Sequence, residues 1–296
     1  MDLKFAAIDI GSNAVRLLLA RVFIANNTEF IKKESLIRMP IRLGEDAFTS
    51  QIISPHKVYS LLNTMMGFKY LINAYQPLDD SACATSAMRE SSNGHEIIKN
   101  IKKKTDISID IIDGKKEAHI IFSNHIERQL EKDHPYLYID VGGGSTEITL
   151  FCQDKSEESR SFNIGTVRLL QNLVNKTAWD EMKQWVKDVS RPYKSITAIG
   201  SGGNINKIFR MSSKKENKPM SFKNINDIYN DLKSYSFEER INKIGLRPDR
   251  ADVILPASEI YLSVMRWANI KSILVPQVGL ADGLIHIMYE KYKNAN

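Results

Sequence analysis

One pattern occurs twice in the chain, and it constrains the fold more than any other feature. Near the middle of the chain, an apolar run ends at Asp140 and is followed by three glycines. A serine and a threonine come next, and then Glu147 leads into a second apolar run. This order predicts a strand, a tight glycine turn and another strand. Glycine has no Cβ, so its N–H can approach an oxyanion closely. The two carboxylates offer the hard oxygen ligands that Mg²⁺ prefers.

Taken alone, this stretch is also compatible with an ordinary glycine-rich hairpin, because short glycine motifs are weak signals. A second copy near the N-terminus favours the functional interpretation. Laid on the first copy without gaps, it matches at three positions: Asp9 on Asp140, Gly11 on Gly142 and Leu17 on Ile148. An internal repeat dictates architecture. If the similarity is not due to chance, it predicts two similar domains, each of which contributes a phosphate-binding turn to a shared cleft.

The bulk properties agree with a two-domain globular protein. The 296 residues can bury two cores, and 43% of them are hydrophobic. The net charge of +6 suits a polyanionic partner, although a merely solubilising charge is equally compatible with it. The basic residues are scattered and lack an aromatic stacking motif, which argues against nucleic-acid binding.

The compartment is predicted from the cysteines and from the absence of long apolar runs. Cys83 and Cys152 each lie in an apolar, strand-like run, so we expect both to be buried and reduced in a cytoplasmic protein. No run of 18 apolar residues occurs, and the N-terminus does not resemble a signal peptide. We therefore expect no membrane span.

Three further positions are candidates for a site. Arg89 stands where a short buried strand meets a helix, and its guanidinium could hold a phosphate; a surface ion pair is the alternative. Glu117 falls in the first turn of a helix predicted to reach about Lys132, where a glutamate is usually just favourable to the helix dipole. Gly202 lies in a third small-residue turn that opens onto a helix, a ready anion site.

Several common catalytic patterns are missing. The six histidines include no pair at the helical metal-binding spacing. The chain has neither a Gly-x-Ser-x-Gly elbow nor a Gly-x-x-x-x-Gly-Lys-Ser/Thr loop, and its glycines lack the dinucleotide-binding spacing.

The remaining motifs stand in one order along the chain, at residues 9–13, 84–89, 113–118, 140–147, 200–203, 250–253 and 279–283. This set resembles the exopolyphosphatase/guanosine pentaphosphate phosphatase family over nearly the whole sequence. The resemblance implies an α/β, actin-like ATPase (ribonuclease H-like) fold with two similar domains and an interdomain cleft, in the family's short form. Domain I would comprise residues 1–117 plus 286–296, and domain II residues 118–285.

The resemblance also implies roles for individual residues. Glu117 matches the catalytic glutamate that activates water, and Arg89 an arginine that reaches the phosphate. Asp140 and Glu147 match acidic residues near Mg²⁺. The positions matching phosphate-binding residues are Asp9, Gly11, Ser12, Asn13, Gly142, Gly143, Gly144, Ser145 and Gly202.

The implied reaction is Mg²⁺-dependent hydrolysis of the terminal phosphoanhydride of inorganic polyphosphate, with release of orthophosphate. Guanosine pentaphosphate hydrolysis is the first alternative, and an actin-like sugar or acid kinase is less well supported. A non-catalytic sensor of polyphosphate or alarmone is the second alternative. It is suggested by departures from the family pattern at Lys116 and Ala14. These two departures and a third one, Ala281-Asp282, bear on substrate preference more than on the chemistry. The family resemblance also suggests a homodimer.

Overall fold

The computed structural model describes residues 3–25, 28–123, 134–152, 155–215 and 218–295. The chain divides into two compact units, residues 1–124 with 279–296 (unit 1) and residues 125–278 (unit 2). The sequence-based boundaries, after residue 117 and before residue 286, cut through helices α5 (Gly114–Phe122) and α13 (Leu280–Ala295), which unit 1 contains whole. The predicted course of α5 from residue 124 to Lys132 lies outside the described residues.

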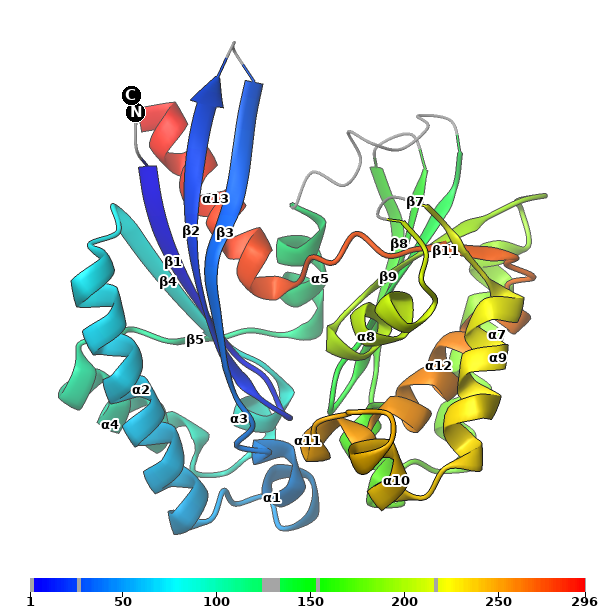
Figure 1. The fold of residues 1–296 in the computed structure, drawn as a ribbon, viewed down its shortest axis with the longest axis horizontal. Helices are drawn as coiled ribbons and strands as arrows, with labels where there is room; N and C mark the ends of the chain where they lie inside the picture. The colour runs from blue at the N-terminus through cyan, green and yellow to red at the C-terminus, as the bar shows by residue number, and fades with distance from the viewer. Residues whose placement is uncertain (1–2, 26–27, 124–133, 153–154, 216–217, 296) are drawn as a thin grey trace. The chain divides into compact units, whose positions relative to one another are not determined.

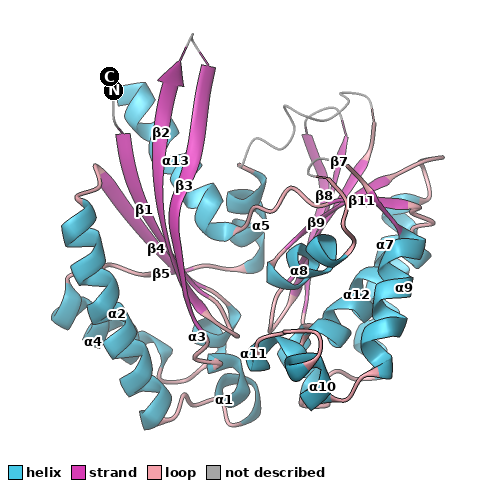
Figure 2. Ribbon diagram, in the orientation of Figure 1, coloured by secondary structure: helices cyan, strands magenta, loops and turns pink. Residues whose placement is uncertain are grey.

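Unit 1 contains a five-stranded sheet in the order β3-β2-β1-β4-β5 (Figures 1 and 2). The strands are β1 Leu3–Ile10, β2 Val15–Ala25, β3 Thr28–Met39, β4 Asp79–Ala84 and β5 Asp110–Ile111. The other helices are α1 Leu43–Thr49, α2 Pro55–Tyr75, α3 Ser86–Glu90 and α4 Gly94–Thr105. Helix α2 begins after Ser54, with Pro55 at the first helical position, where proline is favoured because its missing N–H would have no partner there.

Unit 2 repeats this plan and extends it. Its strands are β6 Tyr136–Val141, β7 Thr146–Cys152, β8 Lys155–Phe162, β9 Thr197–Ser201, β10 Met220–Ser221 and β11 Ser272–Leu274. The sheet order is β8-β7-β6-β9-β11-β10, so its first five strands follow the order seen in unit 1. In both units, the first strand pairs antiparallel with the second and parallel with the fourth.

The helices of unit 2 pack on one face of its sheet. They are α6 Thr166–Leu170, α7 Lys176–Ser190, α8 Gly203–Met211, α9 Phe222–Ser234, α10 Phe237–Asn242, α11 Pro248–Ala251 and α12 Ile254–Trp267. Ile139 and Ile148 point into the core formed with these helices. Because side chains alternate along a strand, Asp140 and Glu147 lie on the opposite face of the sheet. The two carboxylates are therefore separated from the apolar core by the sheet itself.

A β-bulge interrupts the second hairpin of each unit. In unit 1 the register between β2 and β3 shifts at Leu19/Ala20, and in unit 2 the register between β7 and β8 shifts at Leu150/Phe151. A bulge changes which residues stand opposite one another on either side of it. Both bulges therefore decide the cross-strand partners nearer the glycine turns.

The described part of the chain contains no helix that is both long and apolar enough to cross a membrane. Cys83 is buried as expected, whereas Cys152 is half-buried at the end of β7; both are free thiols. The expectation of two buried cysteines is wrong for Cys152, because the strand ends there.

Candidate functional site

The glycine turn of unit 1 follows Asp9, which is buried near the end of β1. Arg16 stands directly opposite Asp9 on β2, and its guanidinium donates to the Asp9 carboxylate. The Gly11 N–H donates to the carbonyl of Ala14 at 3.1 Å and closes the turn. The Ser12 hydroxyl is 2.9 Å from that of Ser86 at the start of α3. The turn thus begins beside a carboxylate whose charge is largely compensated.

The carbonyls of this turn are held by the beginning of α1. Gly44 N–H donates to the Ser12 carbonyl at 2.8 Å, and Arg42 N–H donates to the Asn13 carbonyl at 3.1 Å. A Cβ at Gly44 would lie 2.7 Å from Phe48 Cε2 and 2.9 Å from Ser12 Cβ. A glycine here therefore permits the close approach of helix and turn.

Arg89 and Glu117 are joined through the segment that leads into α5. Arg89 Nη1 donates to the Ile112 carbonyl at 2.6 Å, so the guanidinium is anchored to the chain just before Asp113. Asp113 caps α5 by accepting from the Lys116 N–H at 2.7 Å, and Glu117 follows in the first turn as predicted. The hydrogen bond orients Arg89 against the segment that carries Glu117.

The strands β1, β4 and β5 run parallel, so their carboxyl ends meet at one edge of the sheet; Asp9 lies near the end of β1, Arg89 follows β4 and Glu117 follows β5. Cys83 is the parallel neighbour of Asp9 in the sheet. Burial raises the pKa of the Cys83 thiol to about 12, with contributions from the negative charges of Asp110, Asp9 and Glu117. Asp9, Arg89 and Glu117 therefore lie at the same edge of the unit 1 sheet.

The glycine turn of unit 2 is closed in the same way. Gly142 N–H donates to the Ser145 carbonyl at 2.9 Å, as Gly11 does to Ala14 in unit 1. Thr166 N–H donates to the Gly142 carbonyl and Arg168 Nε to the Gly144 carbonyl. Backbone and side-chain donors of α6 thus hold the carbonyl side of the turn.

Gly165, just before α6, fits this turn more tightly than Gly44 fits its counterpart. A Cβ at Gly165 would lie 2.4 Å from the Gly143 carbonyl oxygen and 2.5 Å from the Gly144 carbonyl carbon. Both contacts are with backbone, which cannot rotate away as a side chain can. Any side chain at position 165 would therefore displace the turn.

A polar row crosses the unit 2 sheet next to this turn. In register, Ser201 on β9 neighbours Asp140 on β6, Asp140 faces Glu147 on β7, and Glu147 faces Ser161 on β8. Glu147 is 2% exposed, and its Oε1 accepts from Ser145 Oγ at 2.7 Å and from Ser161 Oγ at 2.8 Å. Two carboxylates and three hydroxyls therefore gather at one edge of the sheet.

Gly202 and Tyr261 complete this edge. Gly202 has φ +106°, a conformation that favours glycine, and a Cβ there would make a tight contact of 3.1 Å with Asp140 Oδ1. The fully buried Tyr261 hydroxyl donates to the Ser201 carbonyl. Burial, together with the nearby Asp140 charge, raises the Tyr261 pKa well above its ordinary value, which keeps the hydroxyl a donor. The third glycine turn is thereby fixed against the Asp140 strand.

This arrangement fits a hard divalent cation. Asp140 and Glu147 each offer a carboxylate oxygen, and the two oxygens lie within 4.8 Å of each other. Like charges that face each other directly in a sheet are unfavourable unless something compensates them. The Ser201 hydroxyl beside them is fully buried without a protein partner, which suits a site completed by an ion and its water.

The structure groups the predicted site residues by unit. Unit 1 brings together Asp9, Gly11, Ser12 and Asn13, with Arg89 and Glu117 at the same sheet edge. Unit 2 brings together Asp140, Glu147, Gly202 and the turn that contains Gly142, Gly143, Gly144 and Ser145. The predicted use of both turns by one substrate remains a prediction.

Sequence reasoning missed several residues that touch these turns. They are Arg16, Gly44, Ser161, Gly165, Arg168, Ser201 and Tyr261. For Arg16 a signal was present, because the ungapped superposition of the two copies places Arg16 on Glu147. For Ser201 a signal was also present, because it lies within the motif at residues 200–203. The remaining residues contact the turns only through the tertiary fold.

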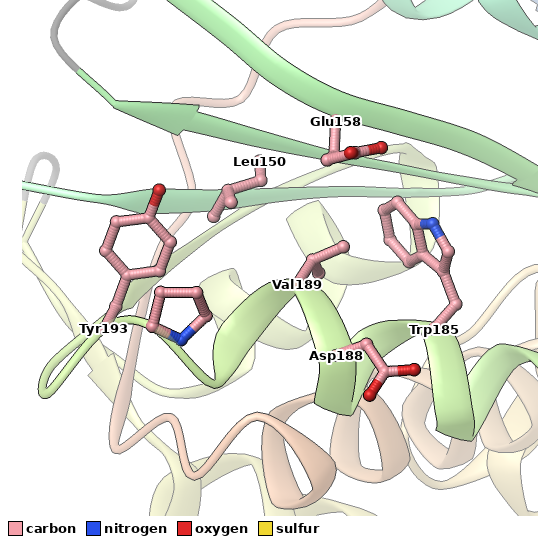
Figure 3. Close-up of a pocket in the computed structure, with 7 residues that line it drawn as sticks. Leu150, Glu158, Trp185, Asp188, Val189 and Tyr193 are labelled. Carbon is pink, nitrogen blue, oxygen red and sulfur yellow. The ribbon is translucent and has the colours of Figure 1, made fainter.

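A hollow of roughly 370 Å³ lies elsewhere in unit 2, between the β7–β8 hairpin and α7 (Figure 3). Trp185 and Tyr193 stand at its two ends. Of its two acidic residues, Asp188 already accepts from Gln184 and Arg191 on its own helix. The lining therefore lacks the set of convergent polar groups found beside the glycine turn.

The chain is similar in sequence to several known proteins, two of which are a phosphatase and an exopolyphosphatase. The chain is 29% identical to a bifunctional 3-dehydroquinate synthase/phosphatase of Fusobacterium nucleatum, over 98% of this chain but 46% of that protein. It is 21% identical to exopolyphosphatase 1 of Mycobacterium tuberculosis, over 96% of this chain and 87% of that protein.

Two further matches extend this picture. A guanosine-5'-triphosphate,3'-diphosphate pyrophosphatase of Photobacterium profundum is 21% identical, over 98% of this chain and 60% of that protein. The crystal structure of an exopolyphosphatase from Cytophaga hutchinsonii superposes with a TM-score of 0.83 at 23% identity, covering 97% of this chain and 98% of that one. The fold is thus the predicted actin-like ATPase fold, built on two mixed sheets.

The profile of the Ppx/GppA phosphatase family matches residues 34–292, which is most of the chain. Family members carry the names of exopolyphosphatases and of a guanosine pentaphosphate pyrophosphatase, all of which hydrolyse phosphoanhydrides. On this evidence, together with the fold, the chain belongs to the Ppx/GppA phosphatase family of phosphoanhydride hydrolases.

Proposed function

We propose that this protein is an exopolyphosphatase, which hydrolyses the terminal phosphoanhydride of inorganic polyphosphate in a Mg²⁺-dependent reaction and releases orthophosphate. The observation that carries the proposal is the facing pair of Asp140 and Glu147 beside a closed glycine turn. A second closed turn in unit 1, with an arginine at the position of Glu147, supports the binding of phosphate.

In this proposal the two turns bind the terminal phosphoryl group through their N–H groups, and Arg89 contributes its guanidinium as a fork. Asp140 and Glu147 would hold Mg²⁺, which when bound neutralises charge on the transferring phosphoryl group. Glu117 takes a proton from the attacking water, which lies in line with the bond that breaks. The water oxygen bonds to phosphorus, and the shortened polyphosphate leaves as an oxyanion.

Guanosine pentaphosphate is the alternative substrate, favoured by the similarity to the Photobacterium profundum pyrophosphatase. Like polyphosphate, it ends in an exposed phosphoanhydride, and the same chemistry would serve both. A sensor without catalysis is the second alternative. Two observations weaken it: the Ala14 carbonyl still closes its turn, and the Lys116 side chain is exposed, with Nζ 3.8 Å from Asp110. These departures leave the acidic groups in place.

The decisive experiment measures phosphate release from long-chain polyphosphate, guanosine pentaphosphate and ATP in parallel, with Mg²⁺ and with EDTA. We expect saturable, Mg²⁺-dependent release that is fastest on polyphosphate. Faster release from guanosine pentaphosphate would replace the primary proposal by the first alternative. Tight binding of polyphosphate without turnover would support the sensor. Cytoplasmic localisation and homodimerisation also remain proposals, and light scattering of the purified protein would test the latter.

A further inference from the structure

Ser161 is a hydroxyl residue of β8 that no motif of the sequence singled out. Its Oγ donates to Glu147 Oε1 at 2.8 Å, and Ser145 Oγ donates to the same oxygen at 2.7 Å. Ser145 is buried within the turn, whereas Ser161 is an exposed residue of the neighbouring strand. Two donors from different segments therefore converge on one carboxylate oxygen.

Such convergence has a geometric consequence. The terminal torsion of a glutamate is broad, so the plane of a carboxylate is not fixed by its own rotamer preference. Asp140 faces Glu147 directly across the strands, and repulsion between the two charges would turn the Glu147 carboxylate away. Two hydrogen bonds to Oε1 oppose that rotation and set the direction of the second oxygen.

We propose that Ser161 is a positioning residue that, with Ser145, holds the Glu147 carboxylate beside Asp140 in the orientation needed to bind a divalent cation. The inference rests on the cation role given to Asp140 and Glu147 under the proposed function. It extends that role to a residue on a third strand, which acts only through Glu147. Groups that orient a metal ligand from outside its coordination sphere typically change metal affinity by about 10–100-fold when they are removed.

Ser159 provides a matched control on the same strand. It stands two residues before Ser161, is also exposed, and its hydroxyl lies 2.9 Å from that of Thr149, a neutral partner on β7. Thr149 and Glu147 lie on the same face of β7. Loss of either serine therefore removes a similar cross-strand hydrogen bond, but only Ser161 touches a carboxylate.

The test uses the whole 296-residue chain with Mn²⁺ alone as the probe, and electron paramagnetic resonance distinguishes bound from free ion. We expect Ser161→Ala to weaken Mn²⁺ binding by about tenfold and Ser159→Ala to leave it unchanged. Ser161→Thr and Ser161→Val have the same shape but differ in the hydroxyl group, so Thr should retain affinity and Val should lose it. This pair controls for any change in folding, which circular dichroism would report for each variant.

The Mg²⁺ dependence of phosphate release gives a second readout. For Ser161→Ala, the Mg²⁺ concentration at half-maximal rate should rise by the same factor, while kcat at saturating Mg²⁺ stays close to wild type. Equal Mn²⁺ affinities of the Thr and Val variants would overturn the inference, as would an equal loss for Ser159→Ala. If the wild type binds Mn²⁺ in a Ser161-dependent way but releases no phosphate, the positioning role stands and the proposed function fails.

Discussion

The two glycine turns share a scaffold but differ in charge. In unit 1 Asp9 faces Arg16, which in turn faces Arg38; in unit 2 Asp140 faces Glu147, which faces Ser161. In the first row Arg16 compensates the Asp9 carboxylate and Arg38 adds a second guanidinium, so the row carries a net positive charge that suits phosphate. The second places two carboxylates together and is suited to a cation. The two turns have the same backbone, but the residue opposite the aspartate differs: it is Arg16 in unit 1 and Glu147 in unit 2. That one difference suits the first turn to an anion and the second to a cation.

The support behind each turn differs as well. In unit 1 the start of α1 is fixed by ion pairs from Lys57 to Glu45 and Asp46. In unit 2 the start of α6 has no acidic residue in its first turn, and the turn is held by backbone donors and Arg168. Unit 1 relies on charges that titrate in acid, whereas unit 2 relies on close backbone packing.

The largest effect is expected from substitution of the two glutamates with different proposed roles, Glu117 as the general base and Glu147 as a cation ligand. Glu117→Gln should lower kcat for phosphate release by about 10²–10⁴-fold, because it removes the proposed general base. Glu147→Gln should lower both the rate and the Mn²⁺ affinity, because it removes a proposed ligand. A Glu117→Gln variant with wild-type turnover would remove this residue from the mechanism and the division of roles with it.

Substitution of Gly165 and Gly44, the glycines that pack against the two turns, should have a smaller effect on rate and stability, and the effect should be larger for Gly165. Gly165→Ala forces a Cβ to within 2.6 Å of three backbone atoms of the unit 2 turn, and should cost about 3 kcal/mol in the free energy of unfolding. A turn displaced by about 1 Å should also cost about a hundredfold in rate. Gly44→Ala meets mainly side-chain atoms and should cost about 1 kcal/mol.

Gly67→Ala in α2 is the control for both glycine variants. Nothing lies within 4 Å of its added Cβ, and the residue is inside a helix. It should stabilise the protein by about 0.5–1 kcal/mol through helix propensity. Urea unfolding of the three variants measures the series; if Gly165→Ala were as mild as Gly44→Ala, the tighter packing assigned to unit 2 would be incorrect.

The smallest effect concerns pH. Burial by itself would raise the pKa values of Glu45 and Asp46, but hydrogen bonds to Glu45 from Lys57 and Arg42, and to Asp46 from Ser54 and Lys57, lower both. Carboxyls with folded pKa values below their unfolded values of about 4.3 and 3.9 add stability above that range, and this stability is lost as pH falls through the folded values.

Lys57→Met should therefore reduce the urea midpoint at neutral pH, and the difference from wild type should shrink as the pH falls below about 4. Far-UV circular dichroism would follow both units, while fluorescence would follow unit 2, which contains Trp179, Trp185 and Trp267. A midpoint difference that does not change with pH would show that Lys57 acts by packing alone.

Much of the fold could be predicted from local signals. The strands around the first turn, the helix that starts at Pro55 and the position of Glu117 in the first turn of α5 all follow from apolar patterning, proline preference and capping. The apolar spacing from Arg250 to about Asn269 predicts one helix, which Pro256 would either kink or begin, but the structure has two helices there, α11 and α12. Pro256 lies in the first turn of α12, so it marks the true start of that helix, one of the two outcomes that its sequence position allowed.

The sequence by itself determined the two glycine turns, their order and the presence of acidic residues beside them, because turn chemistry and strand alternation act over a few residues. It did not determine which side chains face one another across the strands. Counted from the β7–β8 hairpin, where Cys152 pairs with Lys155, Glu147 would face Arg160. The bulge at Leu150/Phe151 shifts the register by one residue and brings Ser161 there instead.

The equivalent bulge in unit 1 places Arg38, and not Ile37, opposite Arg16. A slip of one residue exchanges the two faces of a strand, and the register is fixed by packing of the whole sheet against its helices. The charge of each site edge was therefore decided by tertiary structure, although every residue that carries it is visible in the sequence.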